Sequence, residues 1–319
     1  MIQLPSSALD QLLTPCLVVD VPAASRNIRR CAAFFSGQPA ALRPHFKAHK
    51  CTTLMRQQLA AGGCAGVACQ TSWEALVLAR AGFGDILIAN QVVDAAALDE
   101  VGEAAALARL TVVVDHELQV ELLARAATRH GVPIGALVEL DVGAGRCGLP
   151  FGDASLVPLA EQITRQEGLS FRGLQAYEGH AVHRHSREVR ATLVQQAALQ
   201  IQHEQARLAA AGFDCEVISG GGTGTYDLAA QAGALTEIQV GSYVLMDGRY
   251  GTLDLPFEPA LYCVTTVISR RPSRAVLLIP AHVDPAVNLY DRLFAWSGTG
   301  FTEWEVDGRR HYRLPGFSR

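Results

Sequence analysis

The sequence predicts an α/β protein in which a TIM-type (β/α)8 barrel is joined to a second, smaller β domain. Between about residues 24 and 248, short apolar runs alternate with Ala-rich amphipathic stretches, a pattern typical of repeated βα units around parallel strands. After Met246 this alternation gives way to β-branched runs separated by Pro and Gly. The length of 319 residues also exceeds what one small core usually needs, so a large and a small domain are expected.

Eight short apolar runs between residues 24 and 248 are the predicted barrel strands. In chain order they span residues 41–44, 66–68, 86–89, 111–114, 136–141, 173–176, 216–219 and 237–240. Several of the intervening stretches carry apolar residues at helical spacing and are predicted helices. They span residues 71–81, 95–108, 116–130 and 187–211.

Residues 249–319 are predicted to form the smaller β domain. The β-branched runs 262–269 and 275–279 are its predicted strands, and a tail rich in aromatic residues and arginine follows them. The sequence of this domain therefore differs from that of the barrel in its pattern of apolar residues.

Composition and charge exclude several classes of function. The net charge of −4 leaves no general basic surface, so nucleic acid is not an expected partner. No stretch approaches the uninterrupted apolar length of a membrane span, and residues 1–5 lack the basic and apolar regions of a secretory signal. The eight cysteines form no CxxC pair and are expected to be reduced thiols. A cytoplasmic protein is expected.

An unusual cluster of basic residues follows the first predicted strand. Residues 43–50 contain Arg43, His45, Lys47, His49 and Lys50 within eight positions. Neighbouring cations and partial burial lower the pKa of a lysine, as a lysine that forms an imine requires. A basic surface loop is the alternative interpretation of this segment.

A glycine-rich segment, 219–225, follows the seventh predicted strand. Closely spaced backbone N–H groups at Gly221, Gly222 and Thr223 suit a phosphate, with Gly241 and Ser242 after the eighth strand as further contributors. The alternative is a flexible turn. Because TIM barrels place their chemistry at the C-terminal ends of the strands, the position of this segment favours a phosphate site.

Arg146 and three histidines follow the fifth and sixth predicted strands. Glycines around Arg146 allow the backbone to approach a ligand, whereas the alternative is an ion pair with Asp141 or Glu139. His180 and His183 have a spacing that metal ligands use, but a zinc site needs a third or fourth ligand. Metal binding by these histidines is therefore not the preferred interpretation.

The segment 280–289 contains a second candidate metal site. If its backbone is extended, His282 and Asp284 lie on one side of it, because side chains two residues apart share a face. With added water molecules this pair would suit Mn²⁺ or Mg²⁺. The alternative is a Pro-bounded turn capped by the aspartate.

Several separated motifs resemble those of the alanine racemase-like, fold-type III pyridoxal phosphate enzymes, in the branch of D-threonine aldolases and D-serine dehydratases. The resemblance covers residues 14 to about 277 and again 279–291, without the family segment expected between them, so the second domain looks shortened. The motifs are Thr14 to Asp20, Asn27, the Lys47 segment, Asp85 to Asn90, Tyr177 to His180, Gly220 to Thr223 and His282 to Pro285.

The resemblance implies roles for individual residues. Lys47 would carry pyridoxal 5'-phosphate, Arg146 would lie near its phenolic oxygen and Tyr177 would line it. His183 would act as the base, while His180 would be structural. His282 and Asp284 would hold the divalent metal. Residues 1–23, which include a strand at residues 17–20, would join residues 249–319 in the second domain.

The resemblance implies a metal-assisted lyase that cleaves β-hydroxy-D-amino acids to glycine and an aldehyde. An aspartate at position 284 favours an aldolase, because the resembling dehydratases have a cysteine there and hold zinc. The alternatives are a dehydratase of D-serine or 3-hydroxy-D-aspartate and a non-catalytic protein that binds pyridoxal phosphate. A homodimer acting on a small-molecule substrate is expected.

Overall fold

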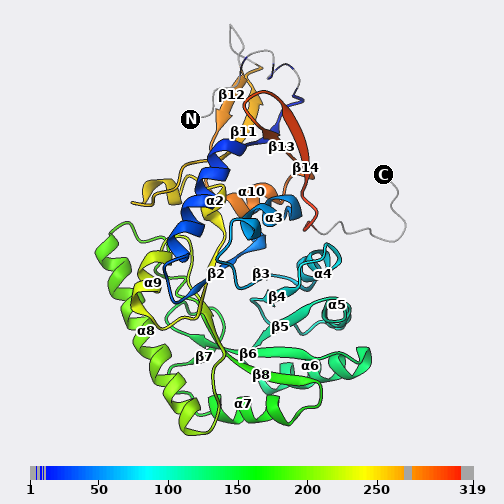
Figure 1. Cartoon of the computed structure of the whole chain (residues 1–319), viewed down its shortest axis with the longest axis vertical. Helices are drawn as coiled ribbons and strands as arrows, with labels where there is room; N and C mark the ends of the chain where they lie inside the picture. The colour runs from blue at the N-terminus through cyan, green and yellow to red at the C-terminus, as the bar shows by residue number, and fades with distance from the viewer. Residues whose placement is uncertain (1–4, 6–7, 9, 11, 269–274, 310–319) are drawn as a thin grey trace.

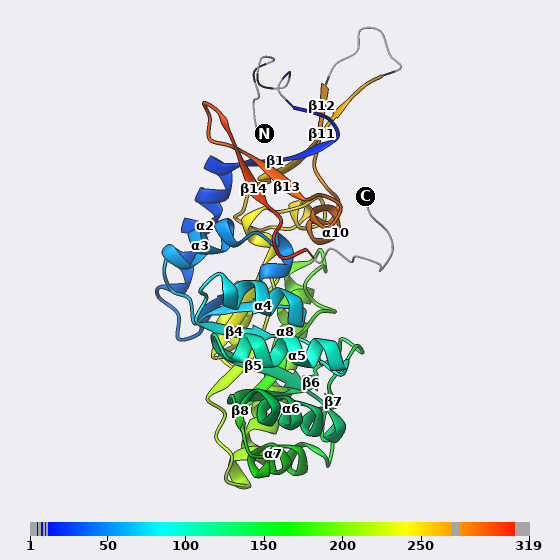
Figure 2. The same cartoon turned by 90° about the vertical axis from the view of Figure 1, so that its right-hand side faces the viewer.

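The computed structural model describes residues 12–268 and 275–309 together with Pro5, Ala8 and Asp10. A large sheet and a small sheet lie at opposite ends of the long axis of the molecule (Figures 1 and 2). The last residue of the predicted strand 262–269 lies outside the described residues, as do the ends of the predicted second domain at 1–4 and 310–319.

Within the described residues, eight parallel strands form the predicted barrel. Their order is β2-β10-β9-β8-β6-β5-β4-β3, and two isolated bridges, Leu42 to Cys64 and His45 to Ala68, bring β2 next to β3. The barrel is therefore nearly closed. The strands are β2 (Ala41–Pro44), β3 (Val67–Cys69), β4 (Asp85–Ile88), β5 (Arg109–Val114), β6 (Ile134–Asp141), β8 (Leu169–Ala176), β9 (Val217–Gly220) and β10 (Glu237–Val240).

All eight predicted strands are present, and β2 and β10 have the predicted bounds. The largest difference is β8, which begins at Leu169, four residues before the predicted start. The first three residues of β8 are partly or fully exposed, whereas its last five are buried. An apolar run detects only the buried part of a parallel strand, and this explains the late predicted start. The two-residue strand β7 (Leu149–Pro150), which pairs with β6, was not predicted.

Helices connect the strands and cover the outside of the barrel (Figure 1). Side chains begin several of them: Thr71 accepts a hydrogen bond from the backbone of Glu74, and Asp94 accepts from those of Ala96 and Ala97. Gly131, with φ 64°, ends α6. The helices are α2 (Val21–Phe35), α3 (Thr52–Ala60), α4 (Ser72–Arg80), α5 (Ala95–Ala105), α6 (Glu117–His130), α7 (Leu156–Arg165), α8 (Arg187–Ala210) and α9 (Tyr226–Ala232).

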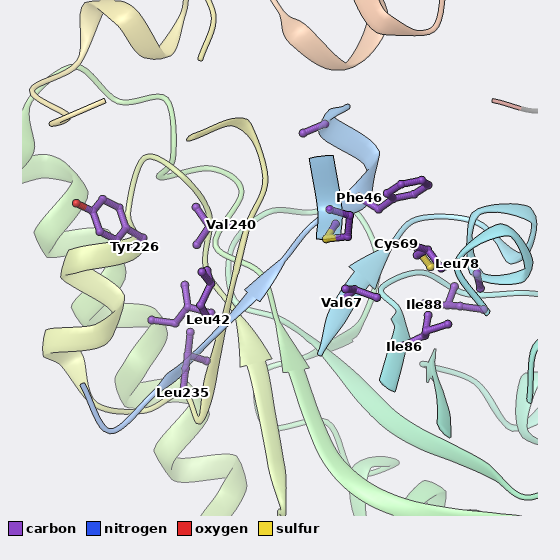
Figure 3. Packing of buried hydrophobic residues seen from close by; sticks show 14 of the residues in the cluster. Leu42, Phe46, Val67, Cys69, Leu78, Ile86, Ile88, Tyr226, Leu235 and Val240 are labelled. Carbon is purple, nitrogen blue, oxygen red and sulfur yellow. The ribbon is translucent and has the colours of Figure 1, made fainter. Parts of the chain in front are cut away.

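The main apolar core lies where the strands pack against these helices. Burying one such aliphatic side chain stabilises the fold by about 1.5–3 kcal/mol. The strands that carry the site are thus held on a rigid frame. Figure 3 shows part of this core: Leu42, Phe46, Val67, Cys69, Leu78, Ile86, Ile88, Tyr226, Leu235 and Val240.

The small sheet has the order β12-β11-β1-β13-β14. Its central strand, β1, comes from the N-terminal part of the chain, pairing antiparallel with β11 and parallel with β13. The N-terminal strand therefore lies in the second sheet, as the resemblance implied. The strands are β1 (Cys16–Asp20), β11 (Leu261–Thr266), β12 (Ala275–Leu278), β13 (Arg292–Trp296) and β14 (Phe301–Glu305).

A short helix, α10 (Val283–Val287), follows β12 and lies at the junction of the second sheet and the barrel (Figures 1 and 2). The expectation of an extended backbone at His282 to Asp284 is wrong at Asp284. His282 is extended, but Asp284 lies in the first turn of α10. Pro285 fits this turn because the first turn of a helix tolerates proline.

Among the described residues, we find no helix with the length and apolar character that crossing a bilayer requires.

Candidate active site

One cavity at the C-terminal end of the barrel strands contains every predicted site residue. The loops after β2, β6, β8, β9 and β10 contribute most of them, and α10 adds the last two from the second domain. The shortening of the second domain therefore leaves the His282 and Asp284 motif facing Lys47. The predicted residues that line the cavity are Lys47, Arg146, Tyr177, His183, Gly221, Gly222, Thr223, Gly241, Ser242, His282 and Asp284.

Lys47 lies in a single 3-10 turn, η1 (Phe46–Ala48), directly after β2. His45 begins this turn, and its Nδ1 accepts a hydrogen bond from the backbone N–H of Lys47 at 3.4 Å. Burial lowers the pKa of Lys47. Asp284 opposes this shift and the Arg146 guanidinium adds to it. The side chain is therefore easier to deprotonate than an exposed lysine.

The other members of the basic segment are used elsewhere. Lys50 forms a buried ion pair with Glu74, and Arg43 lies in β2 and pairs with Glu237 and Asp85. His49 hydrogen-bonds to Gln58 at 2.8 Å, and burial lowers its pKa to about 4. Lys47 is thus the lysine of this segment that reaches the cavity, and His45 is the other member that lines it.

The glycine-rich loop after β9 offers free backbone donors to the cavity. Gly221, with φ 77°, turns its N–H to the buried carboxylate of Glu178 at 3.1 Å, and Thr225 donates its hydroxyl to the same carboxylate at 2.7 Å. No acceptor among the described residues takes the N–H of Gly222 or Thr223. These two donors face a cavity that also holds Ser242, the first residue of η2 (Ser242–Val244). The arrangement fits a phosphate group.

The loop after β10, which contains Gly241 and Ser242, packs closely against the Lys47 turn. A Cβ at Gly241 would lie 3.1 Å from the carbonyl oxygen of His45 and 3.2 Å from the Cβ of Ala48. A larger residue at position 241 would push the two loops apart. Glycine there keeps the lysine and the candidate phosphate site in one cavity.

Arg146 combines the two interpretations of its sequence environment. Its guanidinium pairs with the buried Glu139 at 3.2 Å, and it also lies 5.3 Å from the centre of the Tyr177 ring. Asp141 instead accepts hydrogen bonds from the backbones of Gly143 and Gly145 and so shapes the loop. Burial raises the pKa of Tyr177 to about 12, so its hydroxyl stays protonated.

His183 is a half-buried imidazole at the junction with the second domain. Its ring centre lies 4.7 Å from that of Tyr250, in η3 (Tyr250–Thr252), and 6.5 Å from that of His282. Burial lowers the pKa of His183, with a further contribution from the Arg249 cation, so the ring is neutral near pH 7 and able to accept a proton. His180 does not line the cavity and instead packs against Gly143.

His282 and Asp284 line the cavity, and each has one buried polar atom without a hydrogen-bond partner. The Nδ1 of His282 and the Oδ1 of Asp284 are buried and have no hydrogen-bond partner among the described residues. The same holds for the Nδ1 of His183. Burial raises the pKa of Asp284, which the Lys47 ammonium opposes. Across the described part of the chain, no three His, Cys, Asp or Glu side chains cluster as a metal site. A cation here would have two protein ligands.

Asp247 holds the start of α10 in place. Its carboxylate is fully buried and accepts hydrogen bonds from the backbones of Arg249, Tyr250 and Val283 at 2.9–3.2 Å. His282 makes no side-chain cap of its own. One aspartate therefore fixes both Tyr250 and the His282 motif relative to the end of β10.

Sequence reasoning assigned no role to several polar residues in the cavity. Gln239 in β10 donates its amide to Gln175 in β8 at 3.0 Å and to Ser219 at 2.9 Å. The glutamine itself, within the short buried strand β10, was the available signal, because barrel interiors are usually filled by branched apolar side chains. The unassigned cavity residues are His45, Gln70, Ala89, Asn90, Gln175, Gln239 and Tyr250.

Comparison with known proteins adds sequence relatives to this geometry. The family model for the alanine racemase N-terminal domain matches residues 19–248. A D-threonine aldolase of Arthrobacter sp. is 35% identical, with 99% of this chain and 96% of that protein covered. A 3-hydroxy-D-aspartate aldolase of Paracoccus denitrificans is also 35% identical, over 86% of this chain and 73% of that protein.

Solved structures show the same architecture. The D-threonine aldolase of Filomicrobium marinum superposes with a TM-score of 0.88 at 30% identity, over 93% of this chain and 95% of that one. D-threo-3-hydroxyaspartate dehydratase of Delftia sp. HT23 has a TM-score of 0.84 at 21% identity, over 96% and 100%. The Arthrobacter alignment spans 371 positions for a chain of 319 residues, so that protein has residues without a counterpart here.

Proposed function

The chain belongs to the alanine racemase N-terminal domain family, and on this basis we propose that it is a pyridoxal phosphate-dependent lyase of β-hydroxy-D-amino acids. The proposed reaction cleaves a D-threonine-type substrate between Cα and Cβ, giving glycine and an aldehyde. The observation that carries the proposal is the meeting of Lys47, the free N–H groups of Gly222 and Thr223, and His183 in one cavity.

The cavity residues fit pyridoxal phosphate. Lys47 is half-buried with a lowered pKa, so a fraction of its amine is available to bond to an aldehyde. The N–H groups of Gly222 and Thr223 would hold the phosphate, and Arg146 would stabilise negative charge on the ring oxygen. The chemistry that the bound cofactor supplies is an electron sink for the pair released at Cα.

His183 is the proposed general base. Its neutral ring accepts the proton of the substrate β-hydroxyl, and loss of that proton drives the electron pair of the Cα–Cβ bond towards Cα. The Tyr250 ring packs against the imidazole and limits its orientation. The lowered pKa of His183 keeps the base in its active form near neutral pH.

We further propose that His282 and Asp284 hold Mn²⁺ or Mg²⁺. Their unsatisfied buried atoms support a ligand at this place, and a pair of protein ligands leaves most positions to water, as these hard cations accept. A zinc site would need three or four protein ligands. The chemistry supplied by such a cation is the polarisation of the substrate hydroxyl. The homodimer and the cytoplasmic location stay predictions.

Product analysis tests the proposed function. Purified protein with pyridoxal phosphate and Mn²⁺ should convert D-threonine or D-phenylserine to glycine and an aldehyde, and borohydride should trap the cofactor on Lys47. Ammonia with a keto acid would identify a dehydratase instead, and bound cofactor without turnover would identify a carrier. An adduct mapped to Lys50 would refute the assignment of Lys47.

His183→Ala is the matched control in this assay. The variant keeps Lys47 and the loops after β9 and β10, so the trapped adduct should form as in the wild type. Its turnover should fall roughly a hundredfold or more, because a positioned base contributes about that factor. Unchanged turnover would remove His183 from the proposed mechanism.

A further inference from the structure

The last described residues of the chain contact the turn that carries Lys47. Strand β14 ends at Glu305, and the chain then leaves the second sheet and crosses to the barrel. The backbone N–H of Gly308 donates a hydrogen bond of 2.8 Å to the carbonyl oxygen of Lys50. A segment that is distant in sequence and belongs to the second domain therefore hydrogen-bonds to the residue at the end of the lysine turn.

Asp307 caps the helix that follows this turn. Its carboxylate accepts hydrogen bonds from the backbone N–H of Thr52 at 3.1 and 3.3 Å and from the Thr52 hydroxyl. The residue before the helix, Cys51, makes no side-chain cap. Free N–H groups and the helix dipole favour a carboxylate here, and the chain supplies it from 255 residues away.

Position 308 has no room for a side chain, so only glycine fits there. A Cβ at position 308 would lie 2.3 Å from the Phe46 ring and 2.9 Å from the Cβ of Lys50. The backbone of the segment thus passes directly over the residue that precedes Lys47. This contact needs a glycine, which distinguishes it from a loose surface contact.

The backbone of Lys50 also needs support. Its φ is 50°, in the left-handed region that lysine rarely adopts. Such a conformation persists where the surroundings hold it, and here three contacts do so: the N–H bonds to Phe46, the ammonium pairs with Glu74 and the carbonyl accepts from Gly308. The C-terminal segment supplies one of the three.

We propose that Asp307 and Gly308 are positioning residues that hold the Lys47 turn in the geometry from which its amine bonds to pyridoxal phosphate. The inference rests on the proposed function, because it concerns the bond that Lys47 forms. The two residues touch neither the cavity nor a substrate. They act by fixing both the end of the lysine turn and the start of α3.

The test separates the bond to Lys47 from binding at the phosphate loops. Pyridoxamine phosphate carries an amine in place of the aldehyde, so it occupies the same site without bonding to a lysine. Asp307→Ala should raise the Kd for pyridoxal phosphate about fivefold to tenfold, the effect of losing a helix cap, and lower the trapped yield on Lys47. Its Kd for pyridoxamine phosphate should stay within about twofold of the wild type.

Two further variants complete the experiment. Asp307→Asn keeps one acceptor oxygen for Thr52 and should fall between the wild type and Asp307→Ala; it also carries the test if Asp307→Ala does not fold. Glu258→Gln is the matched control, because Glu258 forms an exposed ion pair of 2.8 Å with Arg26 without touching the lysine turn. It should leave both dissociation constants unchanged.

The outcomes are distinguishable. Equal weakening of both ligands by the Asp307 variants, or no weakening of either, overturns the positioning role. The same weakening in Glu258→Gln would also overturn it. If the wild-type protein itself forms no adduct on Lys47, the proposed function fails first.

Discussion

The two ends of the barrel treat charge in opposite ways. At the N-terminal ends of the strands, acidic and basic side chains form a continuous chain of ion pairs. At the C-terminal ends, the cavity holds a lysine, histidines and an aspartate with unsatisfied buried atoms. In order, the ion-pair chain runs Glu237, Arg43, Asp85, Arg109, Glu216, Arg172.

Pairing makes the N-terminal end stable. Arg43 is buried, yet it contacts Glu237 at 2.6 Å and Asp85 at 2.8 Å, so attraction offsets the cost of removing its charge from water. The Arg172 guanidinium likewise lowers the pKa of Glu216. These groups stay ionised and hold neighbouring strands together.

At the C-terminal end, Arg146 pairs with Glu139, but among the described residues Lys47 and Asp284 form no ion pair, and burial disfavours their charged forms. Burial lowers the pKa of Lys47 and raises that of Asp284, so both shifts favour the neutral forms. Reactivity depends on this difference, because an amine must lose its proton before it attacks an aldehyde. The barrel strands therefore keep paired, stabilising charges at one end and the reactive Lys47 at the other, a few residues apart along the barrel axis.

The largest effect is expected at the unpaired end, for Asp284→Asn. Turnover should fall roughly a hundredfold or more, because the variant weakens the proposed cation site. The thermal midpoint should stay the same or rise, since burial disfavours the ionised carboxylate in the folded state. Steady-state kinetics and thermal unfolding on one preparation measure both.

Chelation provides the control for that variant. Removing divalent cations from the wild type should reproduce the loss of turnover, and added Mn²⁺ should restore the wild type but not the variant. Turnover that survives both chelation and substitution would remove the cation from the mechanism. A large drop in the thermal midpoint would show instead that Asp284 is structural.

The second prediction concerns the paired end. Glu237→Ala leaves the buried Arg43 without its shortest contact and should destabilise the fold by about 3–5 kcal/mol, the cost of breaking a buried pair. The kcat of the folded fraction should change little, because Glu237 lies at the opposite end from the cavity. Urea unfolding and kinetics in the absence of urea measure the two quantities.

Glu103→Gln is the control at the protein surface. Glu103 pairs with Arg80 at 2.8 Å, with about half of each side chain exposed, and exposed pairs contribute little to stability. A loss of stability as large as that of Glu237→Ala would show that burial does not decide the effect. A large loss of kcat in Glu237→Ala would break the separation of the two ends.

The barrel was predictable because parallel strands buried on both faces read as short apolar runs. The location of the site followed from topology, since the C-terminal ends of all barrel strands meet at one end. Lys47 and the 220–223 loop are 173 residues or more apart in sequence, yet both follow such strands. That rule placed them together before any contact was known.

The division of the basic segment was not predictable from its composition. Arg43 and His45 lie two residues apart and face the same side of the strand, but two residues span about 6–7 Å along the axis. That distance places Arg43 in the ion-pair chain and His45 in the cavity. The partner that decides the role of Arg43, Glu237, is 194 residues away in sequence.

The two remote caps were also beyond sequence reasoning. Asp247 caps α10 and Asp307 caps α3, and neither lies next to its helix in the sequence. Local rules search for a cap one residue before a helix. At those positions stand His282 and Cys51, which make no side-chain cap in the structure. Tertiary contact supplies what the local sequence lacks.

The last prediction concerns which end of the barrel loses stability first as the pH falls. His49 belongs to the lysine turn, and its folded pKa of about 4 lies below the ordinary value of 6.5. The unfolded chain therefore binds a proton before the folded one does. As the pH falls from 6.5 to 4, this linkage should remove about 3 kcal/mol of stability. At the paired end, Glu216 has a lowered pKa, so its contribution persists to more acid pH.

His49→Gln isolates this contribution because glutamine does not titrate and its side-chain amide can still hydrogen-bond to Gln58. As the pH falls from 6.5 to 4, the unfolding free energy of the wild type should fall more than that of the variant. Urea unfolding at closely spaced pH values measures the difference. Parallel curves would mean that His49 titrates normally in the folded protein. The acid sensitivity of the lysine turn would then have to originate at another buried group, such as His45, whose pKa burial also lowers.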